Sequence, residues 1–421
     1  YKSLYKTKET YFDKVQELSP GTLLKIDAKS IKKTSKYWKP NFIEDNSLTF
    51  NESVEITRDS LINSVKLRMR SDVPLAFCMS GGVDSNSLVS IASKTLNCNV
   101  HGFTIINTDR RYNEEILVDK SVKELGIEHT KVPLSMKNFL PNIRELVRAH
   151  DSPVSTISYY VHWMLLNQMK NKGYKISISG TGADELYSGY YDHHLFYLAT
   201  IHDQKNLYKK TINNWKKHVA PIVRNKHLQH PEIFLNNPNF RDHIYSGKDF
   251  FHYIKKSFFE PFKEIQYPVN LLRKRMLNEL FQEIVPVILH EDDLNSMYYS
   301  IENRSPLLDR NLFENSLKIP TQYLVRDGKA KSVLRVAMNG IVPDSILSNH
   351  EKVGFNAPIE DLLDFKDSNI KEQILDNSNV FDIIEKKEIE KIKLKNKLSN
   401  SESKFLFSFL NVKIFLEERG F

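Results

Sequence analysis

Two short stretches that combine glycine with acidic residues could do chemistry, and the first is "SGGVDS" at residues 80–85. It lies between an apolar run and a helix-like stretch, where unpaired backbone N–H groups point outward and can hold an anion such as phosphate. Asp84 would repel that anion unless a divalent cation lay between them, and Mg²⁺ prefers one or two carboxylates together with phosphate oxygens. We therefore predict that Asp84 holds Mg²⁺ beside a phosphate, although a glycine turn capped by Asp84 and Ser85 would contain the same residues.

The second stretch is "SISGTGADELYSGYYDHH" at residues 177–194. Gly180 and Gly182 permit close approach of the backbone, and Asp184 and Glu185 supply neighbouring carboxylates. A second acidic loop beside the first is what a shared metal ion requires, so we predict Asp184 as the other Mg²⁺ ligand. A glycine-rich turn capped by Asp184 is the alternative.

Two adjacent histidines, His193 and His194, end this stretch. Neighbouring side chains on a helix point about 100° apart, so the pair lacks the spacing of metal ligands. We expect them at the surface or near a ribose.

The two acidic loops need a scaffold that brings them together. Apolar runs predict buried strands, and between them apolar residues recur at helical spacing. The expected strands are 74–79, 100–106, 128–134 and 175–179, and the expected helices are 54–70, 85–96, 113–125, 137–149 and 158–171. This alternation predicts an α/β fold with a parallel sheet and helices on both faces. Ligands bind at the carboxyl ends of such strands, where both acidic loops lie.

The remaining segments have other patterns. We expect two short strands around a Pro20–Gly21 turn, a polar linker at 41–53, and a predominantly helical region over 195–421.

Composition sets further limits on the class of protein. The 421 residues are 40% hydrophobic and 27% charged, as in globular proteins, and no run of about 18 apolar residues predicts a membrane span. The two cysteines, Cys78 and Cys98, have neither metal-ligand spacing nor a disulfide pattern, which favours a reducing cytoplasm. The net charge of +8 comes with lysine clusters at 207–218 and 384–397, but without a nucleic-acid motif we expect plain basic surface and no nucleic-acid partner.

Several motifs resemble one family in the same order. SGGVDS resembles the pyrophosphate loop of the ATP pyrophosphatase enzymes, and "SGTGADELYSGYY" at 179–191 resembles the SGEGADELFGGY stretch of asparagine synthetases. Three further segments resemble that family: KYWKP at 36–40, 289–320, and 331–358. The resemblance covers roughly residues 5–365.

The resemblance implies ligase chemistry: ATP adenylates a carboxylate, pyrophosphate leaves, and ammonia attacks the acyl-adenylate to form an amide. The positions that match the family's ATP contacts are Cys78, Ser80, Gly81, Gly82, Asp84, Ser85, Ile105, Ser179 and Gly180. The substrate contacts expected by the same resemblance are Thr181, Gly182, Glu185 and Asp151.

The same resemblance implies Lys352 as the catalytic cation, acting with Asp84 and Asp184, because a fixed ammonium stabilises charge that develops on phosphate. Lys352 as one more surface lysine stays open. The matching polar positions of the helical part are Arg304, Asp309, Lys331 and Arg335, for which we favour ion-paired scaffolding.

This sequence departs from the family pattern in places. Thr181 stands where an acid is common, which leaves the amide-forming step in doubt, and His350 stands where arginine is usual. Residues 1–45 resemble only the end of a glutaminase domain with its linker, and the N-terminal cysteine nucleophile of that domain is missing. The chain opens with "YKSLYKTKET" rather than Met, which is typical of a piece of a longer protein.

These observations together predict an asparagine synthetase-like enzyme. We expect a nucleotide-binding α/β part at 46–195 and a helical part at 196–421 that closes the site. Aspartate is the favoured acceptor, with free ammonia or a glutaminase domain or subunit as the nitrogen source, ATP and Mg²⁺ as cofactors, and a homodimer left open. The alternatives are amidation of a sugar uronic acid or another carboxylate, including intramolecular amide closure, and a non-catalytic nucleotide-binding relic. A tRNA-modifying enzyme is disfavoured, since a sulfur-handling cysteine pair is missing.

Overall fold

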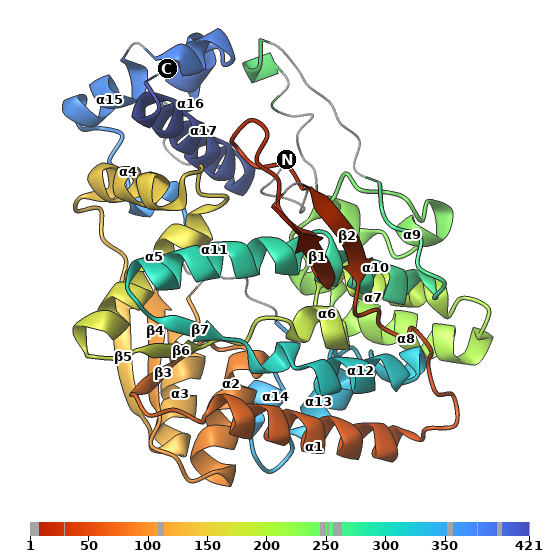
Figure 1. Cartoon of the computed structure of the whole chain (residues 1–421). Coiled ribbons are helices and arrows are strands. Elements are labelled where there is room, and N and C mark those ends of the chain that lie inside the picture. The colour runs from red at the N-terminus through yellow and green to blue at the C-terminus, as the bar shows by residue number, and fades with distance from the viewer. Residues whose placement is uncertain are drawn as a thin grey trace.

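The fold is described from a computed structural model that covers residues 8–28, 30–107, 113–244, 250, 252–255, 263–351, 357–376, 378–393 and 398–420 (Figure 1). The predicted catalytic residue Lys352 lies outside the described residues. Within the described part of the chain, no helix is both long and apolar enough to cross a membrane.

A five-stranded parallel sheet forms the centre of the α/β part, in the order β5-β4-β3-β6-β7. Its strands are β3 (Leu75–Cys78), β4 (His101–Ile106), β5 (Glu128–Pro133), β6 (Ile176–Ile178) and β7 (Glu302–Arg304). The four strands predicted from the sequence are confirmed. β7 is an addition to them, because three residues after a helix carry no periodic signal; it pairs with β6 at the sheet edge.

Helices cover both faces of this sheet, which confirms the predicted fold class. Neighbouring residues of β3 point to opposite faces, so that Phe77 joins one apolar core and Ala76 the other. The Phe77 core includes residues of α1 (Phe50–Arg68), α2 (Val83–Ser90) and α3 (Glu115–Leu125), and the Ala76 core includes residues of α4 (Phe139–His150) and α5 (Ile157–Asn171). A π-helical turn, Ile91–Thr95, continues α2.

The C-terminal half is predominantly helical, as the sequence predicts. Its helices are α6 (Ala183–Tyr187), α7 (Tyr191–Thr200), α8 (Lys205–His218), α9 (Ile233–Asn236), α10 (Leu271–Phe281), α11 (Ile284–Tyr298), α12 (Arg310–Lys318), α13 (Ser332–Ala337), α14 (Asp344–Leu347), α15 (Ser368–Leu375), α16 (Lys386–Lys393) and α17 (Asn400–Glu418). Helix α11 lies beside α5, and α17 lies beside α4 (Figure 1). Arg144 of α4 binds Glu417 and Glu418 of α17 at 2.7 Å each, which fixes the last helix to the α/β part.

The N-terminal strands form a hairpin, β1 (Thr22–Ile26) with β2 (Ile31–Lys36), and the predicted turn position is wrong. Pro20 and Gly21 precede the first strand, and Gly21 has φ +66° there. The hairpin turn follows at Asp27, whose carboxylate accepts the Ser30 N–H at 2.8 Å; this is the local bond that makes Asp a good turn residue. After the hairpin, the Trp38 ring packs against α10 and α12. The division at 45 and 195 remains a prediction.

Candidate active site

The two acidic loops meet because β3 and β6 are neighbours in the sheet. The chain leaves β3 toward β4 on one side and returns to β6 on the other, so the strand order reverses at β3, which is where open α/β sheets bind ligands. Gly180 makes the approach of the loops possible: a Cβ there would lie 3.1 Å from the Ser85 backbone nitrogen and 3.3 Å from the Asp84 Cβ. A side chain at 180 would therefore push the loops apart.

Lys331 lies between the two predicted metal ligands. Its Nζ donates to Oδ1 of Asp84 at 2.7 Å and to Oδ2 at 2.6 Å, and it lies 2.6 Å from Oδ1 of Asp184. The Lys331 side chain is only 5% exposed, and the two carboxylates are 15% and 13% exposed. The carboxylates of two different loops thus converge on one ammonium group.

A second cation, Arg335, lies near Lys331. The guanidinium of Arg335 donates to the carbonyl oxygens of Ala330 and Leu347 at 3.0 and 2.9 Å. Burial lowers the pKa of Arg335, while the charges of Asp84 and Asp184 oppose that shift. Lys331 is thus ion-paired, as we expected, and Arg335 lies close enough to the same two carboxylates to feel their charge.

Gly189 gives the acidic pair its room. A Cβ at position 189 would lie 1.7 Å from Oδ1 of Asp184 and 2.3 Å from Cε of Lys331, distances that real atoms do not adopt. Any larger residue would displace both side chains.

The predicted phosphate loop is held by its own hydroxyls. The Ser80 N–H donates to Oγ of Ser85 at 3.1 Å, and the Gly82 N–H donates to Oγ of Ser80 at 3.2 Å. The Asn86 amide binds the carbonyl oxygens of Ser80 and Gly82 at 2.9 and 2.8 Å. The loop is therefore preformed. The Gly82 N–H, which we expected to face an anion, is bonded within the loop in this state.

The donor set of the acidic site fits Mg²⁺. Carboxylate oxygens are the hard ligands that Mg²⁺ selects, and those of Asp84 and Asp184 already surround one ammonium at 2.6–2.7 Å. Lys331 and Arg335 balance the two carboxylates in charge, so an added Mg²⁺ would leave the site with a net charge of about +2. That charge suits a triphosphate.

Other predicted ATP and substrate positions surround the same strand ends. Cys78 and Ile105 are half-buried at the ends of β3 and β4. The hydroxyl oxygen of Ser179 lies 3.4 Å from that of Thr181 and 3.3 Å from that of Ser305, so hydroxyl groups gather around the position where the family commonly has an acid. Gly182, at φ +105°, leaves room for Leu308, which a Cβ there would approach to 2.4 Å.

The carboxylate of Glu185, which we predicted to contact substrate, bonds to Tyr190 and points away from Lys331. It is 4% exposed and accepts a 2.5 Å hydrogen bond from the Tyr190 hydroxyl. Burial, and secondarily the charge of Asp184, raises the pKa of Glu185 to about 7. The carboxyl thus changes charge near neutral pH inside the protein.

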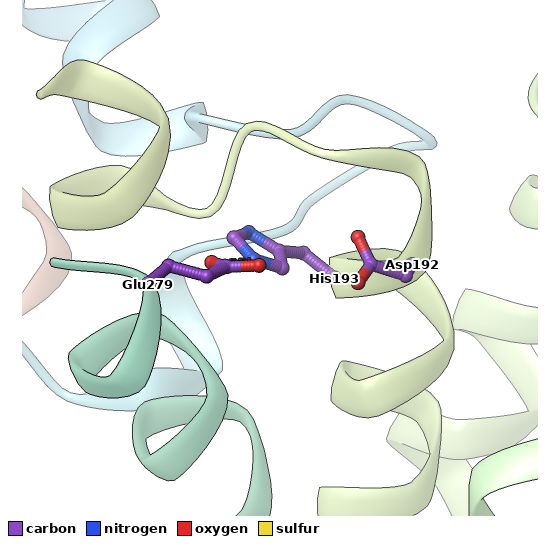
Figure 2. A group of neighbouring side chains, drawn as sticks. All are labelled: Asp192, His193 and Glu279. Atoms are coloured by element: carbon purple, nitrogen blue, oxygen red, sulfur yellow. Dashed lines mark hydrogen bonds and ion pairs between the residues drawn. The ribbon is translucent and has the colours of Figure 1, made fainter. Parts of the chain in front are cut away.

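A buried ionic cluster lies next to Glu185, and Figure 2 shows its Asp192, His193 and Glu279 side chains. His193 Nε2 lies 2.6 Å from Glu279, whose other oxygen lies 2.8 Å from Arg275. His243 Nε2 lies 3.2 Å from Asp192. Because cationic or imidazole groups already face both carboxylates, we interpret the cluster as an ion-pair network that fixes α7 to α10.

Our expectation of a surface or ribose-edge role for the histidine pair is wrong. His193 is fully buried and His194 is 6% exposed. Burial lowers the pKa of His194 to about 3, so this imidazole is neutral. Apolar residues that follow the pair, Leu195 and Phe196, were the signal that the segment enters the core.

Two further predicted positions lie in other surroundings. The Asp151 side chain, at the end of α4, is 61% exposed and pairs with Arg419. His350 stacks on His218 with ring centroids 4.8 Å apart, and burial lowers its pKa. It is therefore neutral near pH 7, unlike an arginine.

The contact of Lys331 with Asp84 was missed because 247 residues separate the two in sequence. One sequence carries no signal for a contact that the fold alone creates. The single hint was that Lys331 matches a polar position of the family's helical part. That match did not distinguish a residue of the site from one that only supports the fold.

Comparisons with known proteins identify a family for this chain. Residues 57–413 match the family described as asparagine synthase. Asparagine synthetase [glutamine-hydrolyzing] 1 of Bacillus subtilis (strain 168) is 27% identical over 380 residues, 82% of this chain and 56% of that protein. Asparagine synthetase [glutamine-hydrolyzing] 3 of the same strain is 23% identical over 357 residues, 80% of this chain and 53% of that protein.

Among solved structures, NMN synthetase from Francisella tularensis matches 33% of this chain and 58% of its own, with 19% identity and a TM-score of 0.23. The chain spans about half the length of the curated relatives it matches. The family match extends over well above half of the chain and includes both acidic loops. This chain belongs to the asparagine synthase family.

Proposed function

We propose that this chain is the synthetase part of an ATP-dependent amide-forming ligase, and that aspartate is its acceptor. ATP adenylates the carboxylate, pyrophosphate leaves, and ammonia attacks the acyl-adenylate to give the amide and AMP. The observation that carries the proposal is the convergence of Asp84 and Asp184 on Lys331 at the strand ends. Membership of the asparagine synthase family supports the reaction class.

We assign each group a role on this basis, and the role of Lys352 rests on the family resemblance alone. Asp84 and Asp184 would hold Mg²⁺, which supplies charge neutralisation at the pyrophosphate. The ammonium of Lys331 and the guanidinium of Arg335 would stabilise negative charge on the phosphates, and Lys352 would act at the α-phosphate. The Ser80–Ser85 loop would contact the pyrophosphate, and Cys78 and Ile105 would border the adenine.

Amidation of a different carboxylate, such as a sugar uronic acid, is the second candidate. Thr181 favours it, because its hydroxyl lies with those of Ser179 and Ser305 where the family commonly has an acid. Hydroxyl groups suit a polyhydroxylated acceptor better than an ammonium group does.

Product analysis tests the reaction and separates the two candidates. The chain would be incubated with MgATP, ammonium chloride and one acid from a panel, and AMP, pyrophosphate and amide would be measured. Equal amounts of AMP and asparagine with aspartate alone would support the first candidate, and an amide from a uronic acid alone would support the second. Hydrolysis of ATP to ADP, with no amide from any acid, would contradict both.

A further inference from the structure

A small cavity lies between the N-terminal segment, the loop that joins α4 to α5, and the start of α11. Its volume is about 200 Å³, and its apolar wall consists of Tyr11 and Phe12 from the N-terminal segment, Pro153 from the loop, and Pro286 and Val287 from α11. An engineered protein cavity of ~150 Å³ binds benzene. The cavity in this chain therefore has room for an aromatic ring with a short substituent.

The polar groups around the cavity are mainly acidic. The carboxylates of Glu17, Asp151 and Glu291 line it, together with the imidazoles of His150 and His290. Lysine and arginine are missing from the described residues that line the cavity, although the whole chain carries a net charge of +8. The charge of the cavity wall therefore favours a cation over an anion.

Glu291 is the buried acid of this cavity, and its side chain is 4% exposed. Its Oε1 accepts hydrogen bonds from the Ser155 N–H, at 3.1 Å, and from the Ser155 hydroxyl. The other oxygen, Oε2, accepts no hydrogen bond from any described residue, and the nearest imidazole nitrogen, Nδ1 of His150, is 3.4 Å away. Asp151, by contrast, is 61% exposed and pairs with Arg419. The Glu291 carboxylate is thus held in one orientation with one oxygen left for a further donor, and a buried acceptor without a donor is costly.

A ligand that matches both features of the cavity has an apolar body and a positively charged donor. A primary ammonium group would donate to Oε2 of Glu291, and such a charge-assisted hydrogen bond is stronger than a neutral one. The apolar body would lie against Tyr11 and Phe12, as ligands commonly do in cavities with apolar walls and few polar groups. We propose that this cavity binds a small organic cation, namely a primary amine with an aromatic or branched aliphatic body.

The amine site is separate from the proposed ligase reaction. The residues to which we assign a role in that reaction do not line the cavity. Failure of amine binding would therefore leave the proposed ligase function untouched, and failure of the ligase function would leave the amine site untouched.

Benzylamine is the probe, because its ring and single methylene group fit the cavity and its amine is protonated at pH 7.5. Benzyl alcohol has the same ring without the charge and is the neutral comparison. Saturation-transfer NMR of each probe, titrated against the whole chain, measures the affinity. We expect benzylamine to bind with a Kd below about 1 mM and about tenfold or more tightly than benzyl alcohol. Equal affinities of the two probes, or no saturable binding of benzylamine, would overturn the proposal.

Two variants locate the bound amine. Glu291→Gln keeps the shape of the side chain and removes its charge, so it should weaken benzylamine binding about tenfold and leave the affinity for benzyl alcohol unchanged. Asp84→Asn should leave both affinities unchanged. Loss of benzylamine binding in Asp84→Asn, with full binding in Glu291→Gln, would place the amine at the acidic pair instead and would contradict the cavity site.

A third variant avoids a buried substitution. Phe12 is 42% exposed, so Phe12→Ala should fold. Loss of this ring should weaken benzylamine and benzyl alcohol by a similar factor of about three to ten, since both probes present the same ring to it. If Glu291→Gln does not fold, Phe12→Ala decides the location, and unchanged affinity for both probes would rule out this cavity as their site.

Discussion

The Nζ of Lys331 lies 2.6 Å from Oδ2 of Asp84, although 247 residues separate the two in sequence. The same ammonium lies 2.6 Å from Asp184, so one buried cation bridges two carboxylates from neighbouring loops. Removing the ammonium or one of the carboxylates upsets the charge balance of a largely buried site, which is costly. Both the stability and the chemistry of the site therefore depend on this charge balance.

Lys331→Met should abolish amide formation and destabilise the protein by about 3–5 kcal/mol, because two buried carboxylates lose their cation. MgCl₂ should restore more thermal stability to this variant than to the unsubstituted chain, since Mg²⁺ can take the vacated place. Thermal unfolding with and without MgCl₂ measures this. Lys413→Met is the matched control: Lys413 is 3% exposed and pairs with Asp376 and Glu417. The control should lose stability and keep activity; equal loss of activity in both variants would contradict a special role for Lys331.

Asp84→Asn should leave the fold intact and abolish adenylation, because the amide removes one of two metal-binding charges. Lys352→Ala should abolish adenylation as well, by removing charge stabilisation at the phosphate. Circular dichroism checks the fold and pyrophosphate exchange checks the reaction. Rates like those of the unsubstituted chain in either variant would refute the corresponding assignment.

Gly189→Ala should lower activity by about 100-fold or more, because its Cβ would occupy the place of Asp184 Oδ1 and Lys331 Cε. Gly340→Ala is the control, since Gly340 has φ +77° but no heavy atom within 4 Å of the place where a Cβ would lie. It should cost about 1 kcal/mol of stability through backbone strain and leave turnover unchanged. Full activity of Gly189→Ala would show that the acidic pair can move without loss.

Glu185 should make stability depend on pH. Its carboxyl has a pKa of about 7 when folded and an ordinary value near 4.5 when unfolded, so the folded state holds the proton longer. Folding free energy is therefore lost as pH rises from about 4.5 to 7, by ~1.4 kcal/mol per unit of pKa difference. Glu185→Gln should be more stable relative to the unsubstituted chain at pH 8 than at pH 5, by thermal unfolding.

The control for this pH effect is Glu55→Gln, at an exposed position of α1. Its stability difference should be small and alike at both pH values. A Glu185→Gln difference that is equally independent of pH would contradict the raised pKa.

Local patterns in the sequence were sufficient for the sheet and for the two acidic loops. Apolar runs marked four strands, and Asp84 and Asp184 each followed one of them, so their meeting at one edge could be predicted. Lys331 could not, because its contact with Asp84 depends on how the helical half packs onto the sheet.

Short elements and local turns were the other source of error. β7 has three residues, too few for alternation to appear, and it is a strand only because β6 offers an edge. Pro20–Gly21 is a strong turn signal that does form a turn, but Asp27 supplies the turn inside the hairpin. Turn residues indicate bends; they do not indicate which bend joins two paired strands.

Exchange of labelled pyrophosphate into ATP tests the central claim most directly, because it reports adenylation of a carboxylate without needing the ammonia step. The account predicts exchange that requires both Mg²⁺ and an acid, with aspartate first in the panel, and that disappears in Asp84→Asn. Exchange without any acid, or none with any acid while MgATP still raises the unfolding temperature, would contradict a carboxylate-adenylating site at Asp84, Asp184 and Lys331.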